Sequence, residues 1–353
     1  MKKYLFLMIF VVLPLIIFGA FLNSSENGSI SMNWFTDEES DSLGVLYDEN
    51  WNVIQRKYVS KESNFHKISF ESLNVKEFFR YRVQSFKNDN LVYDYSGSFK
   101  IQLQEEDTFK FVIYGDNRNG YNTHKHLCNM IKNLDVNLII NSGDLVYNDL
   151  FLSDWEEFFK AVDNTGNSLY YAALGNHEKA AGNFSRIFQL HEEKSYYSFR
   201  QSGVFFIVLN SNDEFHIYSD QYKWLEGELD SEERLRCEFT VIVIHHPPYS
   251  YGEHGDSFFL KLILVPLFEE KRVDLVVSGH DHNYQRIEVN DITYVVSGGA
   301  GAPLYGIEFD EGEYLIKGIK ENHFVLFSYS PGEMKIDCIL KNGEIFDSII
   351  IDK

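Results

Sequence analysis

Cysteine is scarce in this chain of 353 residues. The three cysteines, Cys128, Cys237 and Cys338, lie far apart and form no Cys-x-x-Cys pair. An odd count with such wide spacing argues against a disulfide framework. Cys237 and Cys338 could still form one disulfide, but the sparse use of cysteine favours small core residues at all three positions.

Positive charge is also scarce. The 32 lysines and arginines stand against 53 aspartates and glutamates, which gives a net charge of −21. A sequence-independent grip on nucleic acid requires clustered lysine and arginine, so the composition argues against that class of protein. An acidic chain also repels phosphate, and a phosphate site here would need bound cations to reverse the local field. The hydrophobic content of 44% is enough for a folded core.

The N-terminus carries the pattern of an export signal. A nearly unbroken apolar run, Tyr4–Phe18, follows two lysines and precedes Gly19-Ala20. That order of basic, apolar and small residues is typical of a signal peptide. We therefore expect an exported protein that is periplasmic, secreted or membrane-anchored outside the cytoplasm. Residues 1–22 are either a cleaved signal peptide or a retained anchor, since the run, counted through to Leu22, is just long enough to span a bilayer.

Residues 23–104 form the first predicted domain. Short stretches of alternating polar and apolar residues fill Ser29–Gln104, and one pair of them predicts a hairpin that turns at Asp48-Glu49-Asn50. Short alternating strands at this spacing favour a small β-sandwich. The stretch contains no cluster of ligand-type residues, so we interpret it as a packing or spacer module.

Residues 107–353 form the second predicted domain. After an acidic junction at Glu105–Asp107, apolar strands alternate with helical segments. This alternation predicts layers of helix and sheet. The spacing predicts one helix over Lys125–Leu134 and another that begins with a capping box at Ser153 and Glu156.

Five predicted strands of this domain end in side chains that can bind a metal ion. Ligands of open α/β sheets gather at the carboxyl ends of the strands. Mixed oxygen and imidazole ligands suit zinc, manganese or iron better than calcium or magnesium. Six such groups exceed one tetrahedral site but fit two metal ions that share a carboxylate. The six residues are Asp116, Asp144, Asn176, His245, His280 and His282.

Each of these motifs alone is explained equally well by a turn, a helix start or a rigid loop. Such local roles do not explain why all five motifs occur together. The motifs GDNR, GDLVY, GNHE, IHHPP and GHDH together resemble the five metal-binding blocks of calcineurin-like metallophosphoesterases, and of purple acid phosphatases in particular. Tyr147 lies three residues after Asp144, as the family's tyrosine does, and SGGAGAPLY is similar to a glycine-rich segment common in these proteins.

The resemblance implies an α/β fold, a four-layer α/β/β/α sandwich, for residues 107–353. It also implies that the small all-β domain ahead of it is similar to the fibronectin type III-like domain of plant-type purple acid phosphatases. The resemblance extends over essentially the whole chain after the export signal.

The resemblance further implies a ligand set for two metal ions. In this family the first ion is Fe(III), bound in part by a tyrosinate that gives the purple colour, and the second is Zn, Mn or Fe(II). The residues that would bind the first ion are Asp116, Tyr147 and His282. Those that would bind the second are Asn176, His245 and His280, and Asp144 would bridge the two. Tyr147 has an alternative interpretation as a core aromatic, since the chain contains 22 tyrosines.

Groups that orient phosphate or protonate the leaving oxygen must lie beside the metal ions. His177 of GNHE is the first candidate for the general acid. His254 resembles the substrate-loop histidine of the family, and a solvated loop histidine is the alternative. Arg118 stands where the plant pattern has glycine. It is either a clamp on a non-bridging phosphate oxygen or a structural partner of Asp144.

These features together predict an exported dimetal phosphatase that acts on a small phosphorylated substrate. The resemblance implies hydrolysis of phosphomonoesters by attack of a metal-bound hydroxide on phosphorus. An alternative of the same class is a phosphodiesterase or nucleotidase with the same dimetal site. An alternative of another class is a non-catalytic cell-surface binding protein. Membrane contact is expected only through an uncleaved N-terminal segment, and the oligomeric state stays open.

Overall fold

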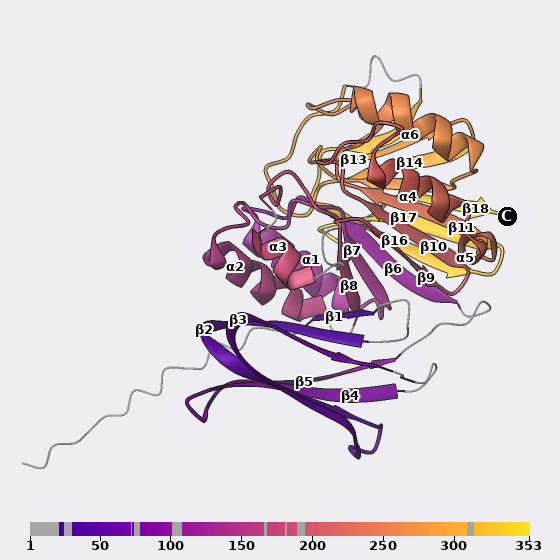
Figure 1. Cartoon of the computed structure of the whole chain (residues 1–353). Coiled ribbons are helices and arrows are strands. Elements are labelled where there is room, and N and C mark those ends of the chain that lie inside the picture. Colours follow the sequence, from indigo (N-terminus) through magenta and orange to yellow (C-terminus); the bar gives the residue numbers. More distant parts are fainter. Residues whose placement is uncertain are drawn as a thin grey trace, which may run out of the picture.

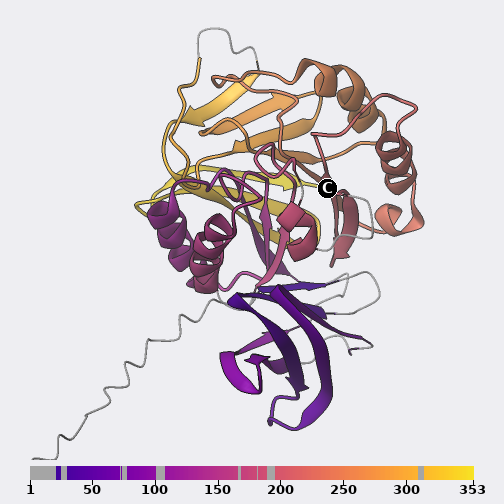
Figure 2. The same cartoon turned by 60° about the vertical axis from the view of Figure 1, so that its left-hand side comes forward.

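The computed structural model describes residues 21–24, 30–71, 73, 78–100, 108–165, 168–180, 182–188, 195–308 and 314–353. Two parts can be followed in Figure 1, an all-β part in indigo and violet and a larger α/β part above it. Figure 2 shows the same two parts in contact from another side. The export signal expected at Tyr4–Phe18 lies outside the described residues.

Between residues 21 and 100 the described chain contains strands and no helix, which confirms the all-β prediction. Two of these strands are long, with 18 residues each, whereas several short strands were expected. Register shifts, one of them between Phe35 and Ser40, interrupt their pairing. The two strands turn at Asp48, whose carboxylate accepts from the backbone N–H groups of Asn50 and Asn52 at 2.9 and 2.8 Å, as the predicted hairpin requires. The strands are β1 (Phe21–Ser24), β2 (Ile30–Tyr47), β3 (Val53–Phe70), β4 (Phe78–Lys87) and β5 (Asn90–Lys100).

The short strand β1 links the two parts. It pairs antiparallel with β2 and parallel with β8, so strands of both parts form one 11-stranded sheet. The domain boundary expected after Leu22 falls inside β1, and the one expected between residues 104 and 107 lies outside the described residues. In the α/β part this sheet contains β18 (Ile345–Asp352), β17 (Glu333–Leu340), β16 (His323–Ser330), β6 (Phe109–Tyr114), β7 (Leu138–Asn141) and β8 (Leu169–Ala172).

The α/β part has a second sheet of seven strands. Its central strands run parallel and are buried along their whole length, which explains their continuous apolar sequences. Antiparallel pairs complete the two edges. In order across the sheet the strands are β15 (Leu315–Ile319), β13 (Tyr284–Val289), β14 (Ile292–Ser297), β12 (Leu275–Ser278), β11 (Phe239–Ile244), β10 (Val204–Leu209) and β9 (Tyr197–Gln201).

Three hydrophobic cores separate four layers in the α/β part. One core lies between the two sheets, where the rings of Phe111 and Phe206 meet edge to face with 5.1 Å between centroids. A second core holds α1 and α2 against the first sheet, and a third holds α4 and α6 against the second. This is the expected α/β/β/α order. The helices are α1 (Tyr121–Lys132), α2 (Leu152–Val162), the 3-10 helix η1 (Asp163–Thr165), α3 (Gly182–Phe188), α4 (Asp220–Leu229), α5 (Glu232–Leu235) and α6 (Phe258–Glu270).

Both predicted helix starts differ from the structure. The first helix begins at Tyr121, four residues before the expected start. The predicted capping box of the second is wrong, because α2 follows directly after Phe151 and Ser153 therefore lies inside the first turn. The Ser153 hydroxyl instead donates to Asp154 Oδ1 at 3.3 Å.

The three cysteines are free, which excludes the alternative disulfide. Cys128 and Cys338 are buried core residues, as expected. Cys237 is only half-buried, and its thiol donates to Glu233 O at 3.4 Å. In the part of the chain that the structure describes, every helix is too short or too polar to cross a membrane.

Candidate metal centre

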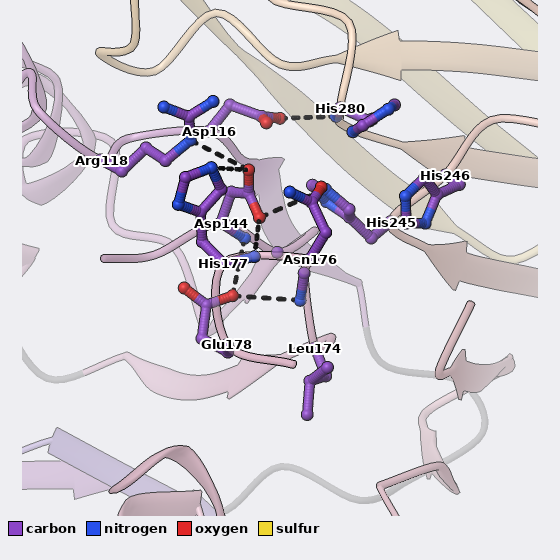
Figure 3. A network of polar contacts seen from close by, with 12 residues as sticks. Asp116, Arg118, Asp144, Leu174, Asn176, His177, Glu178, His245, His246 and His280 are labelled. Carbon is purple, nitrogen blue, oxygen red and sulfur yellow. Dashed lines mark hydrogen bonds and ion pairs between the residues drawn. The ribbon is translucent and has the colours of Figure 1, made fainter. Parts of the chain in front are cut away.

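The five ligand-bearing motifs meet at the carboxyl ends of parallel strands (Figure 3). Asp116 follows β6, Asp144 follows β7 and Asn176 follows β8, and these three strands are parallel neighbours in the first sheet. His245 follows β11 and His280 follows β12, which are parallel neighbours in the second sheet. Because the two sheets pack face to face, the strand ends of both border one site.

Two overlapping groups of side chains have the spacing of metal ligands. Within each group the potential ligand atoms all lie within 4.8 Å of one another. The first group is Asp116, Asp144 and His245, and the second is His245, His246 and His280. Because His245 belongs to both groups, the arrangement suits two neighbouring ions rather than one isolated ion.

The orientation of His245 leaves one ring nitrogen free for a metal. Its Nδ1 donates to Ser142 O at 3.0 Å, which directs Nε2 into the site. Nε2 lies 3.0 Å from Asn176 Oδ1 and 3.4 Å from Asp144 Oδ1. A neutral imidazole with a protonated Nδ1 presents only a lone pair at Nε2, so three acceptors face one another. A cation between them removes that repulsion, as in metal sites where a backbone carbonyl fixes the imidazole tautomer.

Asp116 also lacks a donor that it needs. Its side chain is fully buried, and Oδ2 accepts from the backbone N–H of His280 at 2.8 Å. Oδ1 has no hydrogen-bond partner within the described chain, and His282 Nε2 lies 3.4 Å from it. His282 Nδ1 donates to Pro303 O at 2.6 Å, which fixes that ring as well. A buried carboxylate oxygen without a donor is costly, and a metal ion would satisfy it, so the residues present fit a metal centre.

The backbone is strained at three of the expected ligands. Asp116, Asp144 and His280 have φ angles of 58°, 55° and 68°, in the left-handed region. Such a conformation costs a residue with a side chain about 1–3 kcal/mol and clusters at functional sites. Gly143, directly before Asp144, has φ of 108°, and a Cβ there would lie 2.5 Å from His245 Nδ1. At Gly143 the turn after β7 therefore lies close to His245, which follows β11.

The surroundings favour imidazoles in the form that binds metal. Burial lowers the pKa of His280, and the neighbouring rings of His245 and His246 lower it further. Burial also lowers the pKa of His246, to about 3. Metals bind neutral imidazole. For His282 burial lowers the pKa, but the negative charge of the Asp116 carboxylate, whose Oδ1 lies 3.4 Å from Nε2, outweighs burial and raises it. A metal ion would take the place of that proton.

Asp144, the expected bridging ligand, is held by its neighbours. Arg118 Nε donates to Oδ2 at 3.0 Å, and the backbone N–H of His177 donates to Oδ1 at 3.0 Å. Burial raises the pKa of Asp144, but the nearby positive charge, Arg118 included, and the hydrogen bond from the His177 N–H outweigh burial and lower it, so the carboxylate stays ionised. Of the two roles expected for Arg118, partnership with Asp144 corresponds to a contact in the structure.

The two candidate general acids lie at the rim of the site. His177 is half-buried, and its Nδ1 donates to the backbone O of Tyr147 at 2.6 Å, which leaves Nε2 at 3.8 Å from Asp144 Oδ2. His254 is exposed, and its ring stacks on that of His280 with 4.3 Å between centroids. Both residues border the site, and their roles stay predictions.

Tyr147 lies in the segment after β7, three residues beyond Asp144. Its side chain is 55% exposed, so the alternative interpretation as a core aromatic is wrong. The ring packs beside His177 with 5.4 Å between centroids. Its hydroxyl has no hydrogen-bond partner among the residues that the structure describes. The ligand role of Tyr147 stays a prediction.

Residues 109–284 match the family model described as calcineurin-like phosphoesterase. This segment belongs to that family. It begins at the first residue of β6 and ends at the first residue of β13, so it includes all five ligand-bearing motifs.

Relatives of the calcineurin-like phosphoesterase segment include purple acid phosphatases. Purple acid phosphatase 18 of Arabidopsis thaliana is 32% identical over 163 residues, which are 41% of this chain and 37% of that protein. Fe(3+)-Zn(2+) purple acid phosphatase 12 of the same plant is 31% identical over 129 residues, 36% of this chain and 26% of that protein. The chain thus spans far less than two thirds of the length of these two relatives.

A purple acid phosphatase from yellow lupin (Lupinus luteus) seeds has a similar fold. The two structures superpose with a TM-score of 0.82 at 16% identity, over 94% of this chain and 74% of that chain. The resemblance to purple acid phosphatases expected from the five motifs is therefore confirmed, and the matches support a metal-dependent phosphoesterase.

The calcineurin-like phosphoesterase segment also uses residues that the sequence did not single out. Glu178 is fully buried and accepts three backbone N–H bonds, from Asp144, Val146 and Gly175, at 3.0, 3.0 and 3.1 Å. It thereby ties the loop after β7 to the loop after β8. Burial raises the pKa of Glu178, and the charge of Asp144 raises it further. Its place in GNHE, next to His177, was the available signal.

Asp281 has a corresponding role beside the second sheet. It is fully buried, and its carboxylate accepts from the Ser250 hydroxyl and from the backbone N–H of His254 at 2.9 Å. Tyr305, from the glycine-rich segment, stacks on His282 with 4.0 Å between ring centroids. These contacts hold the loop of His254 and the ring of His282 in place around the site.

Proposed function

We propose that the chain is an exported dimetal phosphatase that hydrolyses phosphomonoesters, as a purple acid phosphatase-like enzyme. The proposal rests on the meeting of the motif side chains at one site where Asp116 Oδ1 has no donor and His245 Nε2 faces two oxygens. Membership of residues 109–284 in the calcineurin-like phosphoesterase family supports the same class of chemistry.

The proposed ligand set uses seven residues. Two ions held there would neutralise phosphate oxygens and activate water for attack on phosphorus. The relative named as an Fe(3+)-Zn(2+) enzyme supports Fe(III) in the first site and Zn, Mn or Fe(II) in the second. The ligands of the first ion would be Asp116, Tyr147 and His282, those of the second Asn176, His245 and His280, and Asp144 would bridge the ions.

Residues at the rim would position the phosphate and the leaving group. Arg118 holds Asp144 through Nε and also interacts with Tyr305, and its guanidinium has further donors for a phosphate oxygen. His177 donates through Nδ1 to a backbone carbonyl, so Nε2 can hold the proton that the leaving oxygen requires. His254, stacked on His280, is the second candidate for that proton transfer.

A cavity of about 160 Å³ next to Arg118 supports a small substrate. It is bordered by α1 and α2, and Tyr147 contributes to its wall. Asp154 and Glu157 also line it. Glu157 pairs with Lys160 at 3.1 Å, and the negative charge that remains disfavours a leaving group that carries further phosphates. This favours small phosphomonoesters over nucleotides.

We also propose that the predicted first domain, residues 23–104, is a fibronectin type III-like module and that the N-terminal segment directs export. The all-β architecture and the fold similarity to the lupin protein over 94% of the chain support the first statement. The order of basic, apolar and small residues around Tyr4–Phe18 supports the second. Fractionation of cells that express the full chain tests export directly.

The activity is tested on purified, metal-loaded protein. Metal content, the visible absorption spectrum and hydrolysis of para-nitrophenyl phosphate and bis(para-nitrophenyl) phosphate are measured from acidic to neutral pH. We expect two ions per chain, a broad visible band that Tyr147→Phe removes, and faster hydrolysis of the monoester. Asp144→Asn should remove metal and activity together, whereas His126→Gln, on the exposed side of α1, should retain both.

Other outcomes would change the proposal in defined ways. A colourless protein with two Mn or Zn ions and a preference for the diester would favour the phosphodiesterase alternative. A protein that binds no metal and hydrolyses neither ester would contradict the proposal and favour a non-catalytic binding protein.

A further inference from the structure

A second pocket lies in the N-terminal part, between β3 and α3, and shares no residue with the metal centre. Its volume is about 420 Å³. None of its lining residues is acidic, although the chain has a net charge of −21. The pocket is therefore positively charged although the chain as a whole is acidic. The lining residues are Ser42, Val59, Lys61, Ser63, Phe65, His66, Lys67, Ser69 and Arg186.

The sequence of β3 places most of these side chains on one face. Successive residues of a strand point to opposite faces, and six of the lining residues occupy every second position from Val59 to Ser69. Arg186, from α3, lies opposite this face, with its guanidinium 5.8 Å from the centroid of the Phe65 ring. Two elements that are distant in sequence thus supply the walls.

Three of the lining residues are cations that no described residue neutralises. Lys61, Lys67 and Arg186 form no ion pair within the described chain, whereas Lys87, elsewhere in the same part, pairs with Glu38 at 2.8 Å. Burial lowers the pKa of Lys67, and no carboxylate opposes the effect. A partly buried ammonium without a counter-charge is costly, and a bound anion relieves that cost.

Hydroxyl groups complete the lining. Ser69 Oγ and Ser31 Oγ lie 2.7 Å apart, so one of the two hydroxyl protons stays available to a ligand. His66 Nδ1 lies 2.7 Å from Ser42 Oγ, and burial lowers the pKa of His66 to about 3, so the ring is neutral and is satisfied inside the protein. The pocket therefore offers charged and neutral donors together.

We propose that this pocket, the Lys61/Lys67/Arg186 pocket, binds a small oxyanion of the phosphate class. Guanidinium and ammonium groups with hydroxyl donors are the chemistry that recognises phosphate oxygens. The volume suits a small ligand, and the net charge of −21 opposes a long polyanion. Because the walls belong to β3 and α3, the anion ties the N-terminal part to the α/β part. The proposal does not depend on catalysis at the metal centre.

The test is the unfolding temperature of the metal-free full chain against the concentration of inorganic phosphate, with ionic strength held constant by chloride. A ligand that binds only the folded state raises the unfolding temperature. We expect a saturable rise for the wild-type protein that is absent in Lys67→Met and Arg186→Ser. Lys57→Met, which removes the same charge from β3 outside the pocket, should keep the rise. So should Asp144→Asn, which alters only the metal centre.

Loss of the response must also be distinguished from loss of the fold. Without phosphate, Lys67→Met should unfold at the same temperature as wild type or higher, because it removes an unpaired ammonium. An equal rise in wild type and Lys67→Met would overturn the proposal. So would a response that Asp144→Asn loses and Lys67→Met keeps, since that result assigns phosphate to the metal centre. Glycerol phosphate run in parallel identifies the source: tighter binding than phosphate indicates an organic ester, and equal binding indicates the free anion.

Discussion

Arg118 and Asp144 form an ion pair at the centre of the proposed chemistry, with 3.0 Å between Nε and Oδ2. The Arg118 side chain is only 14% exposed, so solvent screens the pair little. Arg118→Met removes a partner that orients an expected metal ligand, and changes of this kind cost about 10–100-fold in metal affinity or activity. We expect titration of the metal-free variant with metal to show a loss of that size.

Two further variants define what the Arg118 result means. Arg56 lies at the exposed end of β3, far from Arg118 in the sequence. The Arg56→Met variant loses the same charge and should bind metal like wild type. Arg118→Lys keeps the charge but not the planar donor geometry and should recover only part of the affinity. Unchanged metal affinity together with a raised KM for para-nitrophenyl phosphate would instead make Arg118 a clamp on the substrate.

The residues of the site differ in how far the sequence predicts them. Asp116 and His280 follow apolar strands directly, so a short-range pattern placed them at one edge of the sheets. Glu178 could not be assigned in that way, because its role depends on N–H groups of two loops that meet only after folding. The exposure of Tyr147 could not be predicted from the sequence either, since a loop side chain follows no periodic pattern.

At the scale of the elements, the glycines before the ligands set how closely the loops approach. Gly143 has φ of 108°, and a Cβ there would lie 2.5 Å from His245 Nδ1. We expect Gly143→Ala to displace His245, to lower the unfolding temperature and to reduce metal content. Gly227 of α4 is the control, because a Cβ there would meet nothing within 4 Å. Gly227→Ala should stabilise the protein by about 1 kcal/mol, since alanine favours a helix.

Calorimetry and metal analysis of both glycine variants test whether the close approach at Gly143 sets the position of His245. Equal behaviour of Gly143→Ala and Gly227→Ala would show that the loop after β7 adapts without disturbing His245.

The order of elements in the α/β part followed from the sequence because strand and helix periodicities differ. The ends of individual strands and helices were less predictable than their order. The sequence predicts short strands between Ile30 and Tyr47, but β2 continues through the acidic middle of this stretch, with register shifts in its pairing. A cap at Ser153 predicts a helix that begins at Asp154, whereas α2 begins two residues earlier, at Leu152.

At the scale of the whole molecule, one sheet and one core run through both parts. β1 pairs with β2 on one side and with β8 on the other. Phe35 of β2 stacks on Phe159 of α2 with 6.0 Å between ring centroids. The change of pattern near residue 105 predicted two domains, but pairing between such distant segments leaves no local signal. The two parts therefore share a hydrophobic core and are expected to unfold together.

Buried neutral histidines are spread over this whole molecule. Burial lowers the pKa of His66 in β3 and of His124 in α1 to about 3, and that of His323 in β16 to about 4, from an ordinary value of 6.5. As the pH falls below 6.5, the unfolded chain takes up these protons before the folded chain can. Stability is therefore fully present above that pH and is lost as the pH falls toward the folded pKa. Each histidine costs about 1.4 kcal/mol per pH unit in this window.

His124→Phe isolates one of these contributions. Phenylalanine takes up no proton and can keep the contact that the His124 ring makes with Phe158, at 5.9 Å between centroids, while Tyr114 keeps its hydrogen bond to Tyr170 at 2.9 Å. Denaturant titrations should show the free energy of unfolding falling less steeply with pH in the variant, by about 1.4 kcal/mol per unit. The exposed control His216→Gln should follow wild type, and parallel slopes for wild type and His124→Phe would contradict the argument. If the slopes diverge as expected, acidic pH weakens the fold itself, whatever titrates at the proposed metal centre.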